Sequence, residues 1–155
     1  MRIGHGIDAH AFAEGRPLML GGVSLAHPRG LAGHSDGDVL LHALIDALLG
    51  AAALGDIGGM FPSSESRWKD ASSRDLLGLV HEKLRGAGHS VENVDTVVVA
   101  EEPRLAPYVP AMRQAIAGVL ALDLDRVSVK ATTTDRLGFT GRGDGIAAFA
   151  TVLLQ

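Results

Sequence analysis

The chain has 155 residues, enough for one domain with its own core, and its hydrophobic (46%) and charged (21%) fractions exclude wholesale disorder. A formal net charge of −4 disfavours a nucleic-acid partner, and no apolar stretch approaches the ~20 residues that span a bilayer, so we expect neither nucleic acid nor membrane as a partner. The absence of cysteine excludes disulfides, thiolate metal sites and a cysteine nucleophile, and it suits a cytoplasmic location.

The N-terminal part of the chain predicts strands. Residues 2–12 carry Gly, His and Ile in loose alternation, which favours a first strand. Residues 16–26 predict a hairpin, because two short apolar runs flank the turn-forming pair Gly21 and Gly22.

Two helices separated by a loop are predicted next. Ser35 as N-cap, with an acidic residue three positions later, precedes a long apolar run and predicts a helix that ends near Gly55. Residues 56–65 lack periodicity and are rich in turn formers, so we expect a loop of functional length. The same capping pattern recurs in residues 72–75 and predicts a second helix that ends at residues 86–88.

The C-terminal half adds three strands and one helix. Residues 91–100 are rich in Val and predict a buried strand, and Pro107 or Pro110 starts a third helix. Residues 127–131 and 146–154 predict the last two strands. The order of elements predicts one α/β domain over residues 1–155, with a small mixed four-stranded sheet and helices on one face. Nothing in the chain remains to cover the other face, which predicts an oligomer.

Asp8 and His10 are the first candidate metal ligands. Side chains two positions apart on a strand point to the same face, so both can reach one point above the sheet. A carboxylate with an imidazole suits Zn²⁺ or a neighbouring divalent metal ion. The same spacing would also fit an acid and a histidine that lie on the surface or form a structural hydrogen bond without a metal ion.

His42 lies in a polar stripe, with Asp38 and Asp46, along an otherwise apolar helix. The stripe fits a buried histidine satisfied by two carboxylates. It also fits a metal ligand whose other ring nitrogen is oriented by a carboxylate. Together with Asp8 and His10, His42 would make three protein ligands with an open fourth position, as in catalytic zinc sites.

Two strand-end loops in the C-terminal half suit a nucleotide. Residues 130–145 combine Thr hydroxyls, glycines and Asp135, which can hold phosphate oxygens and Mg²⁺, although they lack the spacing of a P-loop. Residues 100–106 could enclose a base through backbone contacts. Both segments could equally be plain connections.

Taken together, the motifs resemble one family. They are Asp8-Ala9-His10, residues 33–38 with His42, residues 56–58 with Phe61-Pro62, and residues 131–134 with 138–142. In this order and at these separations they resemble the 2-C-methyl-D-erythritol 2,4-cyclodiphosphate synthases of the non-mevalonate isoprenoid pathway. The resemblance covers essentially the whole chain. It implies a homotrimer in which the sheets meet around a threefold axis and the active sites lie between adjacent subunits.

The resemblance also implies roles for single residues. Asp8, His10 and His42 would bind Zn²⁺ or another divalent metal ion, and His34 and Asp135 would be catalytic. The residues implied to contact substrate are Asp8, His10, His34, Ser35, Asp56, Gly58, Phe61, Ala100, Arg104, Leu105, Ala106, Thr132, Thr133, Asp135, Phe139 and Arg142.

Within that set, the resemblance assigns each group to one part of the substrate. His34 and Ser35 would hold the diphosphate, and Asp56 with Gly58 would contact the methylerythritol unit. Residues 100–106 would enclose the cytosine of a cytidine diphosphate-linked substrate. Thr132 and Thr133 would bind phosphate.

This chain departs from the family pattern in two places and matches it in a third that implies a further ligand. Asp135 stands where the family has Glu bridging a second metal ion, Mg²⁺ or Mn²⁺, and its side chain is one methylene shorter. Ser63 and Glu65 stand where Asp is usual. Phe139 and Arg142 match positions that in relatives line a cavity on the trimer axis, which implies an isoprenoid diphosphate as a further ligand.

The implied reaction is a metal-dependent intramolecular phosphoryl transfer by a phosphorus–oxygen lyase. It converts 4-diphosphocytidyl-2-C-methyl-D-erythritol 2-phosphate to 2-C-methyl-D-erythritol 2,4-cyclodiphosphate and CMP. Two alternatives remain open at this point: a metal-dependent phosphohydrolase, and a non-catalytic trimer that binds a nucleotide or a prenyl diphosphate.

Overall fold

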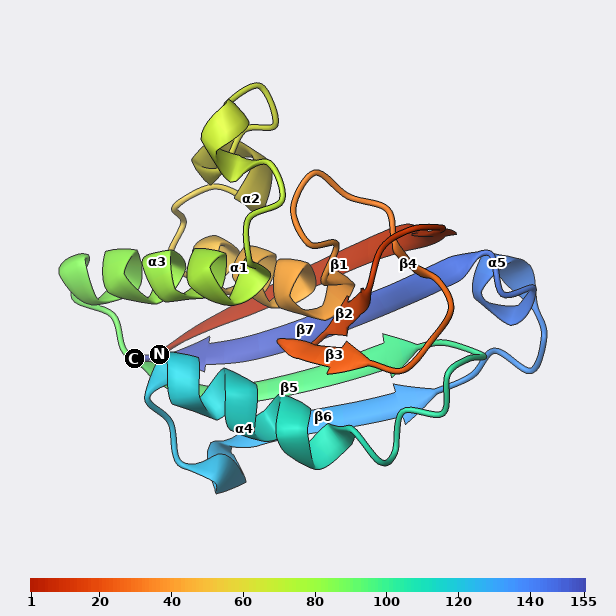
Figure 1. Ribbon diagram of the computed structural model, residues 1–155. Coiled ribbons are helices and arrows are strands. Elements are labelled where there is room, and N and C mark those ends of the chain that lie inside the picture. The colour runs from red at the N-terminus through yellow and green to blue at the C-terminus, as the bar shows by residue number, and fades with distance from the viewer.

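A five-stranded mixed sheet is the framework of the computed structural model, which describes residues 1–155 (Figure 1). Its order is β4-β1-β7-β5-β6, in which β5 and β6 are parallel and the other pairs antiparallel. The strands are β1 (Arg2–Ala13), β4 (Gly30–Leu31), β5 (Val91–Val99), β6 (Val127–Thr132) and β7 (Gly145–Leu154). The predicted mixed sheet is confirmed with one strand more than expected, because the two-residue β4 is too short to show any alternation.

Three helices cover one face of this sheet, as predicted (Figure 1). They are α1 (Val39–Ala51), α3 (Ser73–Gly86) and α4 (Val109–Leu120). The predicted hairpin is present as β2 (Leu18–Leu20) and β3 (Val23–Leu25), and short helical turns complete the fold as α2 (Ile57–Met60), η1 (Ser66–Trp68), η2 (Leu124–Arg126) and α5 (Gly138–Gly141). None of the helices is long and apolar enough to cross a membrane.

The N-terminus of α1 differs from the prediction. Asp38, not Ser35, is the N-cap, because its carboxylate accepts a hydrogen bond from the backbone N–H of Leu41. The same carboxylate accepts from Gly21 N at 2.9 Å and Gly22 N at 2.7 Å, which fastens the β2–β3 turn to the helix. The helix ends at Ala51, before the expected stop near Gly55.

Helices α3 and α4 begin where the sequence predicts, and the expected loop between α1 and α3 contains an additional turn. Ser72 occupies the N-cap of α3, but its hydroxyl makes no capping bond; the carboxylate of Asp36 accepts from Ser73 N instead. The first turn of α4 contains Pro110, so the later of the two candidate prolines starts the helix. The expected loop after Gly55 contains one helical turn, α2, which Asp56 caps through Gly59 N at 2.8 Å.

Helix α1 lies unusually close to β1. A Cβ atom at Gly4 would come within 1.8 Å of the carbonyl oxygen of Ala47, and one at Gly6 within 2.1 Å of that of Ala43. Only glycine leaves room for this contact. Because 11 of the 13 residues of α1 are buried between the sheet and α3, the helix position is fixed on both sides.

The sheet face away from the helices carries apolar side chains that nothing in the chain covers. Ile3 and Ile7 on β1 are 75% and 58% exposed. Alternation along the strand explains this, because the intervening Gly4 and Gly6 face α1 and are buried.

Because α1 and β1 are in close contact, we expect that one added methyl group between them strongly lowers stability. Gly6→Ala should lower the free energy of unfolding by about 3 kcal/mol or more, because the new Cβ meets backbone that cannot move aside cheaply. Gly118→Ala is the matched control: its Cβ meets nothing within 4 Å in α4, and alanine there should raise stability by up to about 1 kcal/mol. Urea unfolding at one fixed protein concentration measures both, and equal midpoints for the two variants would contradict the account.

Candidate metal centre

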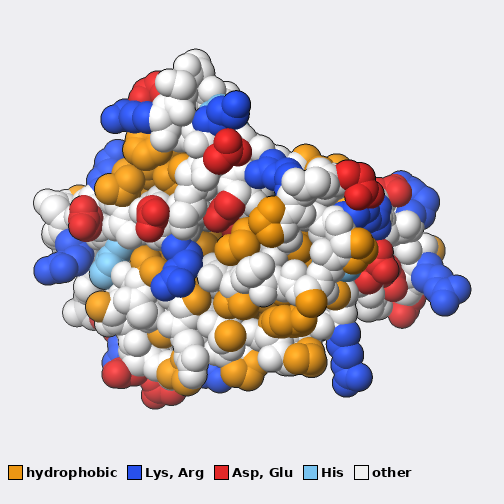
Figure 2. Space-filling view, in the orientation of Figure 1, with side chains coloured by type: hydrophobic (Ala, Val, Ile, Leu, Met, Phe, Trp, Pro, Cys, Tyr) orange, Lys and Arg blue, Asp and Glu red, His pale blue; other side chains and the backbone are white.

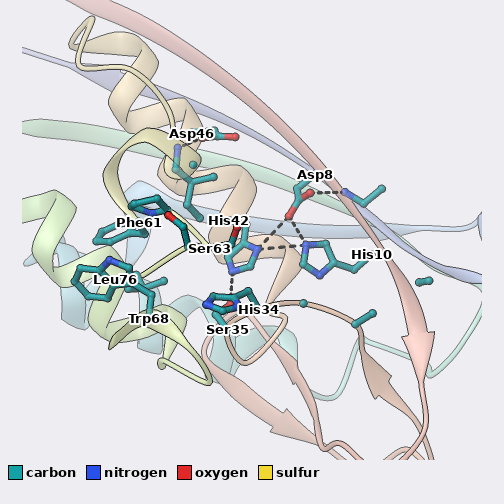
Figure 3. A pocket seen from close by; sticks show the side chains of 18 residues that line it. Asp8, His10, His34, Ser35, His42, Asp46, Phe61, Ser63, Trp68 and Leu76 are labelled. Carbon is teal, nitrogen blue, oxygen red and sulfur yellow. Dashed lines mark hydrogen bonds and ion pairs between the residues drawn. The ribbon is translucent and has the colours of Figure 1, made fainter. Parts of the chain in front are cut away.

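Asp8, His10 and His42 converge on one point, as the sequence predicts (Figure 3). Strand β1 presents Asp8 and His10 on one face, and the first turn of α1 brings His42 against them. Asp8 Oδ2 lies 2.8 Å from His10 Nε2 and 3.2 Å from His42 Nδ1, and the two ring nitrogens are 3.3 Å apart. The three residues therefore form a group that can hold a metal ion.

The donor set of this group fits a divalent metal ion. Two imidazole nitrogens and one carboxylate oxygen aim at one another, with their ligand atoms all within 4.8 Å. This is the ligand chemistry of catalytic zinc centres, in which three protein ligands leave a position open. The residues present thus match the metal-binding set predicted from the sequence.

Charge at the centre favours a cation. Burial acts to raise the pKa of Asp8, but hydrogen bonds and charge attraction from His10 and His42 outweigh it and hold that pKa well below its usual range. Burial acts to lower the pKa of His10, yet the hydrogen bond and negative charge of Asp8 raise it above its ordinary value. Asp8 is therefore an ionised carboxylate placed to stabilise positive charge between the two rings.

The two carboxylates of the predicted stripe, those of Asp38 and Asp46, form no hydrogen bond with His42. Asp38 is fully buried, holds the β2–β3 turn and has a pKa that burial raises. Asp46 accepts from Ile57 N at 2.7 Å and so holds the start of α2. The interpretation that either one orients His42 was wrong; the atoms at His42 Nε2 are the hydroxyls of Ser35 at 2.9 Å and Ser73 at 3.0 Å.

A cavity of about 710 Å³ opens beside the centre. Of the residues predicted to bind substrate or metal, it is lined by Asp8, His10, His34, Ser35, His42, Gly58 and Phe61. Figure 3 shows Phe61, Trp68 and Leu76 together on the side away from β1, so one wall is apolar and the other carries the metal ligands.

The segment between α2 and α3 contributes Phe61 and Trp68 to that apolar wall and projects beyond the helical layer (Figure 1). Charged side chains flank this projection below its tip, and hydrophobic ones lie at its base (Figure 2). The ring of Phe61 packs edge-on against Trp68, with centroids 4.9 Å apart. Ser63 lines the cavity, whereas Glu65 pairs with Arg67 at 2.6 Å. Asp56 is not among the lining residues, since its carboxylate caps α2.

The remaining predicted residues form a second group at the ends of β5 and β6. Ala100 N donates to Thr132 O at 3.0 Å, and Asp135 N donates to Thr133 Oγ1 at 3.3 Å. Leu105 is buried, whereas Arg104, Ala106 and Phe139 are exposed. Of the predicted residues, only Arg142 lines the smaller cavity, of about 270 Å³, at this end of the molecule. No residue lines both cavities, so one chain does not bring the two predicted halves of the site together.

Several residues at the metal centre were not identified from the sequence. Ser73 comes from α3, more than thirty positions after His42, and no local pattern distinguishes it from Ser72. Arg16 donates to the carbonyl oxygens of Gly33, at 2.7 Å, and of Ser35, and so fixes the backbone on either side of His34. The only signal for such residues is spatial proximity.

Comparisons with known proteins agree with this arrangement. Residues 1–155 match the YgbB family. The 2-C-methyl-D-erythritol 2,4-cyclodiphosphate synthase of Syntrophomonas wolfei is 60% identical over 155 residues, which cover 100% of this chain and 99% of that protein. The bifunctional IspDF of Campylobacter jejuni superposes with a TM-score of 0.95 and 47% identity, over 99% of this chain and 42% of that longer one.

A second solved structure carries a ligand. It is a 2C-methyl-D-erythritol-2,4-cyclodiphosphate synthase with CDP bound, and it superposes with a TM-score of 0.91 and 36% identity over 99% of this chain and 100% of that one. These matches favour the synthase over the phosphohydrolase and the non-catalytic binding trimer.

Removing one ring should empty the centre. His42→Ala should abolish stoichiometric zinc at near-normal folding, because two ligands hold Zn²⁺ far less tightly than three. Metal analysis of the purified protein, with circular dichroism as the check on folding, measures this. His81→Ala is the control, since His81 bonds to Val119 O on another face and its loss should leave zinc unchanged. Full zinc occupancy in His42→Ala would show that the ligands lie elsewhere.

Proposed function

The chain belongs to the YgbB family and is similar along its whole length to 2-C-methyl-D-erythritol 2,4-cyclodiphosphate synthases. We propose that its metal centre serves the reaction of these synthases, the formation of a cyclic diphosphate. The substrate is 4-diphosphocytidyl-2-C-methyl-D-erythritol 2-phosphate, and the reaction is that of a phosphorus–oxygen lyase in isoprenoid biosynthesis. The observation that carries the proposal is the convergence of Asp8, His10 and His42 at the wall of a cavity that also exposes His34 and Ser35.

The reaction needs little covalent chemistry from the protein. An oxygen of the 2-phosphate attacks the β-phosphorus, the bond between that phosphorus and the oxygen bridging to the α-phosphate breaks, and CMP leaves with the bridging oxygen. Both reacting groups belong to one molecule, so the protein mainly folds the substrate back on itself, and such positioning can contribute roughly 7–11 kcal/mol. Asp8, His10 and His42 would hold a Zn²⁺ ion, which would supply Lewis-acid polarisation of the attacked phosphate.

His34 and Ser35 hold the diphosphate at the mouth of the centre. Both line the cavity, and the Arg16 guanidinium fixes their backbone through the carbonyls of Gly33 and Ser35. A rigid backbone matters here, because a phosphate displaced by even an ångström loses its alignment for in-line attack. His34 is exposed and free to contact the transferring phosphoryl group, in keeping with its proposed catalytic role.

The methylerythritol unit lies between α2 and the apolar wall. Gly58 and Phe61 line this part of the cavity, and Asp56 lies at the cap of α2. Ser63 supplies a hydroxyl where relatives have Asp, and Glu65 is engaged by Arg67. The hydroxyl groups of the methylerythritol unit are therefore contacted mainly by residues at the α2 end of the cavity.

The cytidine half of the substrate is bound by the second group of residues. Ala100, Arg104, Leu105 and Ala106 enclose the base. Thr132 and Thr133 bind phosphate, and Mg²⁺ or Mn²⁺ would lie near Asp135, the second proposed catalytic residue. The exposed Asp135 carboxylate and the nearby hydroxyls at the ends of β5 and β6 support this assignment.

We assign completion of the site to a neighbouring copy in a homotrimer. No residue of the second group lines the cavity beside the metal centre within one chain, which supports a site shared between subunits. Uncovered Ile3 and Ile7 give the sheet an apolar face that a threefold arrangement would bury. Phe139, 43% exposed beside Arg142, would then face the axis and suit an isoprenoid diphosphate. Residues 1–155 act as one domain, and the cysteine-free composition suits a cytoplasmic location.

The activity has a direct test. The purified protein, supplied with the cytidyl substrate, Zn²⁺ and Mg²⁺, should release CMP and the cyclic diphosphate in equal amounts, followed by ³¹P NMR. Asp8→Asn should lower the rate at least about 100-fold, because it removes the negative charge that holds the cation. Asp123→Asn is the control, because Asp123 is exposed, makes no side-chain capping bond and does not line the cavity. A folded, metal-loaded protein that leaves the substrate intact would overturn the proposal.

A further inference from the structure

Ser73 links the metal ligand His42 to a carboxylate that is not in the metal centre. Its side chain is completely buried at the start of α3. The hydroxyl lies 2.5 Å from Asp36 Oδ1 on one side and 3.0 Å from His42 Nε2 on the other. Its backbone N–H also donates to Asp36 Oδ2 at 2.9 Å, so Ser73 and Asp36 are held together by two bonds.

The direction of these hydrogen bonds follows from the atoms that carry protons. Both oxygens of Asp36 accept from backbone N–H groups, Oδ2 from Ser73 and Oδ1 from Asp38 at 3.2 Å, so the carboxylate acts as an acceptor. The single hydroxyl proton of Ser73 is therefore donated to Asp36. Ser73 Oγ can then only accept from His42, so this contact is a hydrogen bond only when the ring proton is on Nε2. The competing acceptor for that proton is Asp8 Oδ2, 3.2 Å from Nδ1.

We infer that Asp36 and Ser73 form a one-way hydrogen-bond chain that fixes the proton of His42 on Nε2 and leaves Nδ1 free to bind a metal ion. The inference rests on the proposed metal centre, which Nδ1 faces. Asp36 and Ser73 are positioning residues: they act on the metal through the tautomer and orientation of His42.

Ser35 fits the same assignment. Its hydroxyl is 2.9 Å from His42 Nε2, so the Nε2 proton points between two hydroxyl oxygens. With both oxygens as acceptors, the hydroxyl proton of Ser35 remains available to a phosphate oxygen in the cavity. If the His42 proton were on Nδ1 instead, the Nε2 lone pair would face the Ser73 oxygen, whose proton is already donated to Asp36.

The test reads the tautomer itself. Metal-free, substrate-free protein labelled with ¹⁵N-histidine is examined by long-range ¹H–¹⁵N correlation NMR, under conditions in which the ¹⁵N shifts show neutral imidazole rings. Native protein should show His42 with its proton on Nε2. Asp36→Asn, whose amide can donate as well as accept, and Ser73→Ala should populate the Nδ1–H form and weaken Zn²⁺ binding about 10- to 100-fold in chelator competition.

The chain offers matched controls. Ser72→Ala removes a hydroxyl that makes no capping bond, and Asp75→Asn changes an exposed carboxylate in the same first turn of α3; both should keep the native tautomer and zinc affinity. If Ser73→Ala does not fold, Asp36→Asn carries the comparison, because it preserves shape. An Nδ1–H tautomer in native protein, or native tautomer and zinc affinity within about twofold in folded Asp36→Asn, would overturn the inference. Because neither substrate nor turnover is involved, failure of the proposed synthase activity would leave this result standing.

Discussion

The contact between α1 and β1 determines whether the metal centre exists. Asp8 and His10 come from the strand and His42 from the helix, so the distance between the two backbones sets the distance between the ligands. Glycine at positions 4 and 6 lets the helix backbone touch the strand, where any Cβ would force the elements apart. The ligands thus stand on two packed regular elements, which hold a site more accurately than loops do.

The segment before α1 fixes the backbone that borders the cavity. Asp36 and Asp38 are two residues apart, yet they bond in different directions: Asp36 to the start of α3, and Asp38 to the β2–β3 turn. Arg16 holds the carbonyls on either side of His34. Backbone that must face phosphate is therefore fixed by hydrogen bonds from Arg16, and the side chains of His34 and Ser35 line the cavity. On the opposite sheet face, Ile3 and Ile7 stay exposed. An exposed apolar face of this kind is consistent with the proposed assembly, in which a neighbouring copy covers it.

Local sequence patterns predicted the parts of this structure that depend on local physics. Alternation and apolar runs located β1, α1 and β5, and the i, i+2 spacing of Asp8 and His10 placed both on one face. The N-cap of α1 was misplaced, because the preference for Asp38 depends on a turn seventeen residues earlier in the chain. The partners of His42 were also wrong, since Ser73 is brought there by the packing of α3 on α1. Roles for the residues at the ends of β5 and β6 came from resemblance to a family and not from any local pattern.

The central claim is that this metal centre serves a transfer within one substrate molecule, with no water as a reactant. Turnover in water enriched in ¹⁸O, with mass spectrometry of both products, tests it most directly. The account predicts a cyclic diphosphate and CMP that both contain no ¹⁸O, because the attacking oxygen belongs to the 2-phosphate and the leaving oxygen was already in the substrate. One ¹⁸O atom in either product, together with a linear phosphate, would mean that water attacks and would contradict the account.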